Sequence, residues 1–178
     1  MGIQLGIIGY GGMGGFHHRN ASKIEGVQVV GAYDIDPVRV QVAEKNGIKG
    51  FSTLEDLLSC DEINTVLVAV PNDKHMELCV KAANAGKHVI CEKPAAMNVR
   101  ELDQMIAAAG RNGKIFTVHQ NRRWDKDFRI VKKILDSGEL GKVYSIQSRL
   151  HGSGGVCSVG AEKKSTAAVC FMIGECIL

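Results

Sequence analysis

The chain has 178 residues, of which 45% are hydrophobic and 23% are charged, and its formal net charge is +3. This composition is typical of a globular protein and excludes a disordered or collagen-like chain. The small net charge gives no indication of a nucleic-acid or membrane partner, and no stretch reaches the roughly 18 consecutive apolar residues that cross a bilayer. Residues 1–9 lack the basic segment and cleavage site of a secretory signal, so we expect a cytoplasmic protein.

Six cysteines stand at positions 60, 79, 91, 157, 170 and 176. They form no C-x-x-C pair, and no histidine lies at zinc-finger spacing from them. We therefore expect no metal site, and we expect the first three cysteines to be reduced and mostly buried thiols.

Apolar runs and amphipathic segments alternate through the first 120 residues. Strands are predicted at 3–8, 27–33, near 51, 65–70, 88–91 and 115–118, with helices at 13–22, 37–46, 54–58 and 73–85 and around 102–109. Asp36 and Pro37 begin the second helix, because Asp at the N-cap accepts a backbone N–H and Pro fits the first helical position. This alternation predicts an α/β fold, a doubly wound parallel sheet of the Rossmann type.

The pattern changes after His119. Residues 127–136 are predicted to form a helix with Phe128, Val131 and Leu135 facing inward, and residues 142–150 alternate partly, as in an antiparallel strand. We interpret this as the start of an α+β substrate domain. The expected organisation is a dinucleotide-binding domain over 1–120, the beginning of a second domain over 121–155, and a tail over 156–178.

A glycine-rich turn follows the first predicted strand. Gly9, Gly11 and Gly14 form G-x-G-x-x-G, in which the first glycine allows the tight turn, the second lets the backbone approach a pyrophosphate, and the third lets helix and strand pack closely. Asp34 ends the second strand 20 residues after Gly14. Its carboxylate can accept hydrogen bonds from the adenosine ribose hydroxyls and would repel a 2′-phosphate, which favours NAD and leaves NADP open. The alternative is a glycine turn plus a helix-flanking Asp.

Two further segments leave predicted strands at the edge where ligands bind in open α/β sheets. Residues 70–75 read Val-Pro-Asn-Asp-Lys-His, where helix capping and a surface position for His75 are the competing interpretations. Residues 91–94 read Cys-Glu-Lys-Pro. Lys93 could donate a proton or a hydrogen bond to a substrate hydroxyl oxygen, with its pKa lowered by burial near the nicotinamide, whereas a solvated Glu-Lys ion pair is the alternative.

Taken with Asn121-Arg-Arg-Trp-Asp125, these motifs resemble the glucose–fructose oxidoreductase / inositol dehydrogenase / rhizopine catabolism (Gfo/Idh/MocA) family over about residues 3 to 153. The resemblance implies hydride transfer with sugars, inositols and related polyols, usually by homo-oligomers, and leaves this chain's own oligomeric state open. It places the glycine turn and Asp34 on the dinucleotide, Glu92 near the nicotinamide and Lys93 at the reacting hydroxyl. The implied cofactor-site residues are Gly9, Gly11, Gly12, Met13, Gly14, Asp34, Pro71, Asn72, His75, Glu92, Lys93, Asn121 and Arg122.

The chain departs from this family after residue 153. Family members continue for roughly another 180 residues and supply a D-x-x-x-H segment whose histidine is the usual general base, and the 178 residues contain no such segment. A shifted reading of the codons of 161–178 gives Asp from Met172-Ile173 and permits His from Cys176-Ile177, at the missing spacing. We therefore hypothesise a frameshift near residues 153 to 161, which makes 156–178 non-native, and expect little turnover from this chain.

Three functional interpretations follow. The first is an NAD-dependent sugar or polyol dehydrogenase, cut short. The second is a stand-alone dinucleotide-binding module or sensor without catalysis, and the third is a dehydrogenase of another Rossmann family, against which Glu92-Lys93-Pro94 argues. The basic residues between 122 and 133 are interrupted by Asp125 and Asp127, which favours a solvated helix face over a nucleic-acid site.

Overall fold

The computed structural model describes residues 2–146. The described chain falls into two units with the boundary after Arg129, and each is considered by itself. The tail at 156–178, residues 147–150 of the predicted strand and the region of the frameshift hypothesis, near residues 153 to 161, lie outside the described residues.

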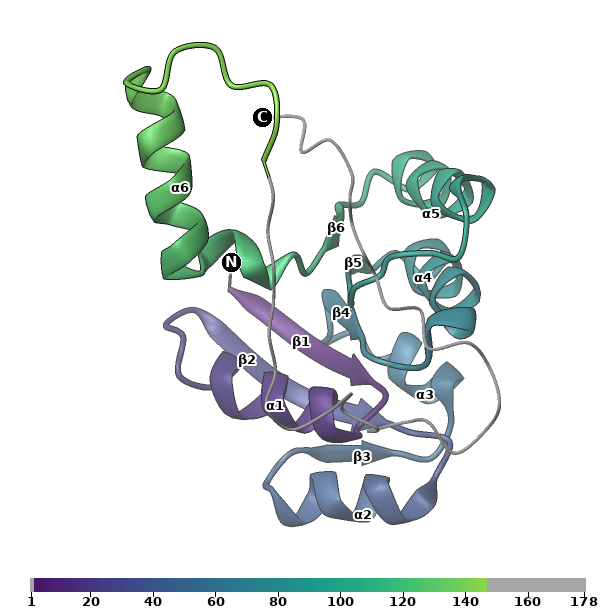
Figure 1. Ribbon diagram of the computed structural model, residues 1–178. Helices are drawn as coiled ribbons and strands as arrows, with labels where there is room; N and C mark the ends of the chain where they lie inside the picture. Colours follow the sequence, from purple (N-terminus) through teal and green to yellow (C-terminus); the bar gives the residue numbers. More distant parts are fainter. Residues whose placement is uncertain (1, 147–178) are drawn as a thin grey trace, which may run out of the picture. The chain divides into compact units, whose positions relative to one another are not determined.

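The first unit is built on a six-stranded parallel sheet in the order β3-β2-β1-β4-β5-β6, shown in Figure 1. The strands are β1 (Ile3–Ile8), β2 (Val27–Tyr33), β3 (Lys49–Phe51), β4 (Thr65–Val68), β5 (His88–Cys91) and β6 (Phe116–Val118). The chain runs outward from β1 to β3 and then returns to the other side of β1, so the topological switch point lies between β1 and β4. The predicted doubly wound sheet is confirmed, and such sheets bind ligands at the carboxyl ends of the strands around this point.

Helices join the strands. They are α1 (Gly12–Ala21), α2 (Pro37–Lys45), α3 (Leu54–Leu58), α4 (His75–Asn84), α5 (Val99–Arg111) and α6 (Lys126–Ser137), with short 3₁₀ turns at Asn72–Lys74 and Asn121–Trp124. Side-chain caps fix several starts: Asp36 accepts from the Val38 N–H at 2.9 Å, and Asn98 accepts from the Glu101 N–H at 3.0 Å. No helix among residues 2–146 has the length and hydrophobicity needed to cross a membrane.

Each face of the sheet carries its own apolar core, because successive strand residues point to opposite faces. On β1, Ile7 packs with the core beneath α1 and α2, whereas Ile8 packs with the core beneath α3, α4 and α5. Both side chains are almost fully buried. The expectation for the first cysteines holds: Cys79 and Cys91 are buried, Cys60 is half-buried, and all three are free thiols.

Three expectations differ from the structure. Strand β4 ends at Val68, and a 3₁₀ turn precedes α4, since Pro71 has no N–H to continue a regular ladder. In α6, Phe128 and Leu135 are half-buried and Val131 is exposed, so among the described residues the expected inward face is only partly buried. Residues 142–146 form no strand.

Candidate functional site

Two glycines make the turn after β1 sterically obligatory. Gly9 has φ +91°, and a Cβ there would lie 2.5 Å from the Ala69 carbonyl oxygen of the adjacent loop. A Cβ on Gly14 would lie 2.0 Å from the Gly9 carbonyl oxygen. Both distances are far shorter than van der Waals contact, so α1 can pack against β1 only with glycine at both places.

The middle of the same turn is open. Gly11 precedes α1 and has no side chain to cap the helix, so the N–H groups of the first turn, including those of Gly12 and Met13, lack intrahelical acceptors. A Cβ on Gly12 would meet nothing within 4 Å. Open space beside unsatisfied N–H donors at a helix N-terminus suits a phosphate group, so these residues fit the pyrophosphate of a dinucleotide.

Asp34 lies next to this turn and is 7% exposed. Its Oδ2 accepts from the Tyr10 N–H at 2.7 Å, and its Oδ1 accepts from the Asp36 N–H at 2.9 Å. These bonds fix the carboxylate at the end of β2, where its remaining lone pairs can accept ribose hydroxyls. The Arg39 Nη1 lies 3.6 Å from Oδ2 and contributes a positive charge at the same place.

The loop after β4 contains the first unexpected arrangement. Pro71 and Asn72 are exposed, but His75 is fully buried, so the interpretation of His75 as a surface histidine is wrong. Its Nδ1 lies 2.8 Å from the Pro94 carbonyl oxygen and its Nε2 lies 3.0 Å from the Val70 carbonyl oxygen. Both ring nitrogens therefore join two loops at the sheet edge, and a contact of His75 with the cofactor stays a prediction.

The surroundings of His75 favour its charged form. Burial opposes the imidazolium, but the neighbouring Cys91 side chain and the hydrogen bonds with the Pro94 and Val70 carbonyls outweigh it and raise the pKa of His75. A doubly protonated ring can donate to both carbonyl oxygens at once, which a neutral ring cannot. His75 thus binds the loop after β4 to the turn after β5.

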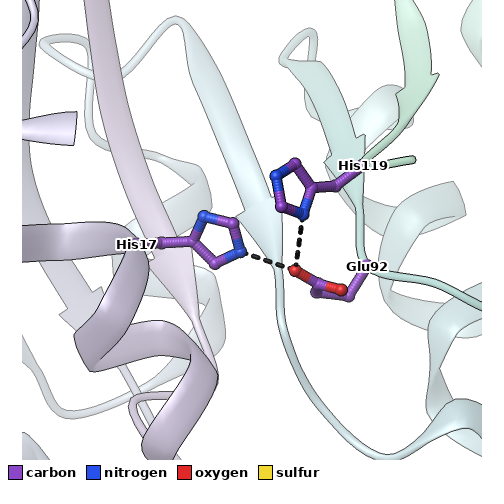
Figure 2. A group of neighbouring side chains, drawn as sticks. All are labelled: His17, Glu92 and His119. Atoms are coloured by element: carbon purple, nitrogen blue, oxygen red, sulfur yellow. Dashed lines mark hydrogen bonds and ion pairs between the residues drawn. The ribbon is translucent and has the colours of Figure 1, made fainter. Parts of the chain in front are cut away.

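Glu92 is held between two histidines, as Figure 2 shows. His17 Nε2 on α1 donates to Glu92 Oε1 at 2.6 Å, and His119 Nδ1, just after β6, donates to the same oxygen at 2.9 Å. Burial raises the pKa of Glu92, but the hydrogen bonds from His17 and from the Lys93 N–H, with the nearby imidazoles, outweigh burial and lower it to about 2. Glu92 is therefore an ionised, largely buried carboxylate at neutral pH.

Lys93 follows Glu92 with an exposed side chain, and its backbone N–H donates to Glu92 Oε2 at 3.0 Å. Lys93 forms no ion pair with Glu92 among the described residues, contrary to the alternative of a solvated Glu-Lys pair. Asn121 and Arg122 begin the 3₁₀ turn after β6 and are exposed, and Arg122 Nη1 donates to Asp125 at 2.7 Å. Every predicted site residue thus lies at or beyond the carboxyl end of a strand.

Sequence reasoning missed four residues that shape this edge. His17 and His119 hold Glu92, and neither stands at a spacing from Glu92 that marks a contact. Tyr10 is buried, with its hydroxyl 2.6 Å from His18 Nδ1 and accepting from Asn46 at 3.1 Å. Burial lowers the pKa of His18, whose Nδ1 makes the hydrogen bond with the Tyr10 hydroxyl. The sequence feature that points to these residues is their position, either shortly after a predicted strand or in the first helix.

Comparison with known proteins identifies the family. Residues 3–120 match the family model described as "Oxidoreductase family, NAD-binding Rossmann fold" (GFO_IDH_MocA). The inositol 2-dehydrogenase of Salmonella typhimurium is 35% identical over 154 residues, which are 84% of this chain and 46% of the relative. The myo-inositol 2-dehydrogenase of Thermotoga maritima is 30% identical over 147 residues, 82% of this chain and 44% of the relative.

Solved structures agree. An NAD-binding protein from Listeria innocua superimposes with a TM-score of 0.77 at 42% identity, covering 80% of this chain and 42% of that one. The WlbA dehydrogenase from Bordetella pertussis, solved with NADH and UDP-GlcNAcA, gives 0.74 at 30% identity, with coverage of 80% and 42%. The chain thus spans less than half the length of these relatives. With the glycine turn, Asp34 and the Glu92-Lys93 segment at one sheet edge, the chain belongs to the Gfo/Idh/MocA family of oxidoreductases with an NAD-binding Rossmann fold.

Proposed function

We propose that this chain supplies the cofactor-binding portion of an NAD-dependent dehydrogenase that acts on a hydroxyl carbon of a sugar, an inositol or a related polyol. One observation carries the proposal: the glycine turn, in which glycine is sterically required, lies at the same sheet edge as Glu92 and Lys93. Relatives at 30–35% identity named as inositol dehydrogenases support the substrate class.

Each residue has a separate task in this proposal. The N–H groups of Gly11, Gly12 and Met13 bind the pyrophosphate, and Asp34 accepts the ribose hydroxyls. The bound NAD supplies the hydride acceptor. Lys93 extends an exposed ammonium from a fixed backbone and donates a hydrogen bond to the substrate hydroxyl oxygen, which orients that group.

Low turnover is proposed for the 178 residues alone, because a group to remove the substrate's hydroxyl proton is not provided by the residues named above. A dehydrogenase must remove the hydroxyl proton while hydride leaves carbon, and the chain as written contains no D-x-x-x-H segment to supply the base. Loss of a positioned general base typically costs about 10²–10⁴-fold in rate. A binding module without catalysis is the alternative, and resequencing the gene from codon 145 distinguishes the two. A single-base change that restores an Asp-x-x-x-His reading and a long open frame supports the dehydrogenase, whereas a confirmed stop favours the module.

Titration of the full chain with NADH, followed by NADH fluorescence, tests the cofactor site. Gly11→Ala is the informative variant, because an added Cβ meets only the flexible end of Arg39, at 3.1 Å, and the fold should be kept. We expect the Kd for NADH to rise by at least about tenfold, since the methyl group stands where the pyrophosphate must approach.

Gly110→Ala is the matched control. Gly110 lies in α5, and a Cβ there meets nothing within 4 Å. Its Kd for NADH should equal that of the parent chain. Equal affinity in parent and Gly11→Ala, or no NADH binding by a folded parent chain, would refute the proposed cofactor site.

A further inference from the structure

His17, Glu92 and His119 place three potential ligand atoms within 4.8 Å of one another. They come from three separate elements, namely α1, the end of β5 and the segment after β6 (Figure 2). We propose that these three side chains form a binding site for a divalent transition-metal ion of the Zn²⁺ class. The proposal does not depend on the proposed dehydrogenase function.

The donor set fits this class of ion. Two imidazole nitrogens with one carboxylate oxygen bind Zn²⁺ and its neighbours, and a three-residue set leaves a coordination position for water or another ligand. The relevant atoms are His17 Nε2, Glu92 Oε1 and His119 Nδ1. The side chain of Glu92 is 7% exposed, and those of His17 and His119 are 13% and 32% exposed. The carboxylate is therefore shielded from solvent, while an ion can reach it past the more exposed imidazoles.

The distances require a small adjustment. The two nitrogen atoms lie 2.6 Å and 2.9 Å from Glu92 Oε1, whereas tetrahedral ligands about 2.1 Å from a metal are separated by about 3.4 Å. Each imidazole must therefore withdraw by less than about 1 Å. The two rings meet edge to face, with centroids 4.7 Å apart and an interplanar angle of 75°, so this movement does not force one ring through the other.

The protons can be accounted for. In the structure each imidazole donates one N–H to Glu92, and metal binding requires a lone pair on that nitrogen instead. Each ring provides it by carrying its proton on the opposite nitrogen. The carboxylate oxygens need no such rearrangement, and Oε2 keeps the hydrogen bond from the Lys93 N–H at 3.0 Å. That bond orients the ligand from behind, as outer hydrogen bonds do in metal sites.

The test is a titration of the metal-free full chain with Co²⁺, which substitutes for Zn²⁺ and gives visible absorption bands in a tetrahedral site. Two variants keep the hydrogen bonds to Glu92 while removing the ligands: His17→Gln and His119→Asn place an amide N–H near the donating ring nitrogen. We expect one equivalent of Co²⁺ in the parent chain, at least about tenfold weaker binding in each variant, and unchanged thermal stability of both variants without metal.

His88→Asn is the matched control. His88 accepts from the Ile115 N–H through Nδ1 at 3.0 Å, and the Asn oxygen can take its place, so one imidazole is lost elsewhere without loss of the bond. This variant should bind Co²⁺ like the parent. Absence of visible bands in the parent, undiminished binding in either ligand variant, or loss of the bands after cysteine alkylation would overturn the proposal, the last because it assigns the ion to thiolates.

Discussion

The hydrogen bonds of Glu92 predict a specific dependence of stability on pH. The pKa of Glu92 is lowered from 4.5 to about 2 in the folded chain. A carboxyl group with a lowered folded-state pKa stabilises the fold above its unfolded pKa, and this stabilisation is lost as the pH falls towards the folded value. The affected window therefore lies between about pH 5 and pH 2.

The magnitude follows from the same two values. A shift from 4.5 to about 2 corresponds to about 3 kcal/mol of the free energy of unfolding at neutral pH, of which about 1 kcal/mol is left at pH 3. Because the Glu92 side chain is only 7% exposed, solvent screening reduces this figure little. We expect the difference in unfolding free energy between the parent chain and Glu92→Gln to narrow by about 2 kcal/mol from pH 6 to pH 3.

Urea unfolding followed by circular dichroism at several pH values measures this difference. Glutamine keeps the shape of Glu92 and one carbonyl acceptor but cannot ionise. The other carboxyl groups are the same in both proteins, so their contributions to the pH dependence cancel in the difference. Glu62→Gln is the matched control, because it removes a carboxylate at an exposed position away from this cluster. A difference for Glu92→Gln that is constant with pH, or that widens towards pH 3, would refute the reasoning.

Two further substitutions test separate features. Lys87 is 8% exposed, and its ammonium donates to the Cys60 and Ile63 carbonyl oxygens at 2.9 and 2.7 Å. Lys87→Met should therefore lower the free energy of unfolding, measured in urea, by about 2–3 kcal/mol. A loss below about 0.5 kcal/mol would show that these bonds contribute little to stability. Asp34→Asn removes the charge that would repel a 2′-phosphate, and Arg39 lies 3.6 Å away, so the ratio of the Kd for NADPH to that for NADH should fall by about tenfold. An unchanged ratio in parallel titrations would assign the preference to other residues.

The sequence predicted the fold well where one local rule decides the outcome. Strands such as Ile3–Ile8 and His88–Cys91 were predicted with the bounds that the structure shows, because short apolar runs between glycine and polar residues have few alternatives. The glycine turn was also predictable, since G-x-G-x-x-G carries its own steric reasons. Helix α6 was predicted within one residue at each end, whereas the burial of its apolar face was predicted only in part, because burial depends on what packs against the helix and not on periodicity alone.

The contacts across the site were not predictable in the same way. Glu92 bonds to His17, 75 residues earlier, and to His119, 27 residues later, and no local pattern encodes such pairs. Only the rule that parallel strands end at one edge brings the three close, and it does not say which side chains touch. His75 was misplaced for a related reason: its burial comes from the Pro94 carbonyl, which belongs to the turn of the next strand.

These contacts together explain how Lys93 is presented. On one side Glu92 accepts the Lys93 N–H and is itself fixed by two imidazoles, and on the other His75 binds the carbonyl of Pro94. The backbone of Lys93 is therefore held at both neighbours while its side chain is exposed. A group that must meet a substrate atom within a few tenths of an ångström needs such support from residues that do no chemistry. All of the supporting contacts named above join residues of the first unit.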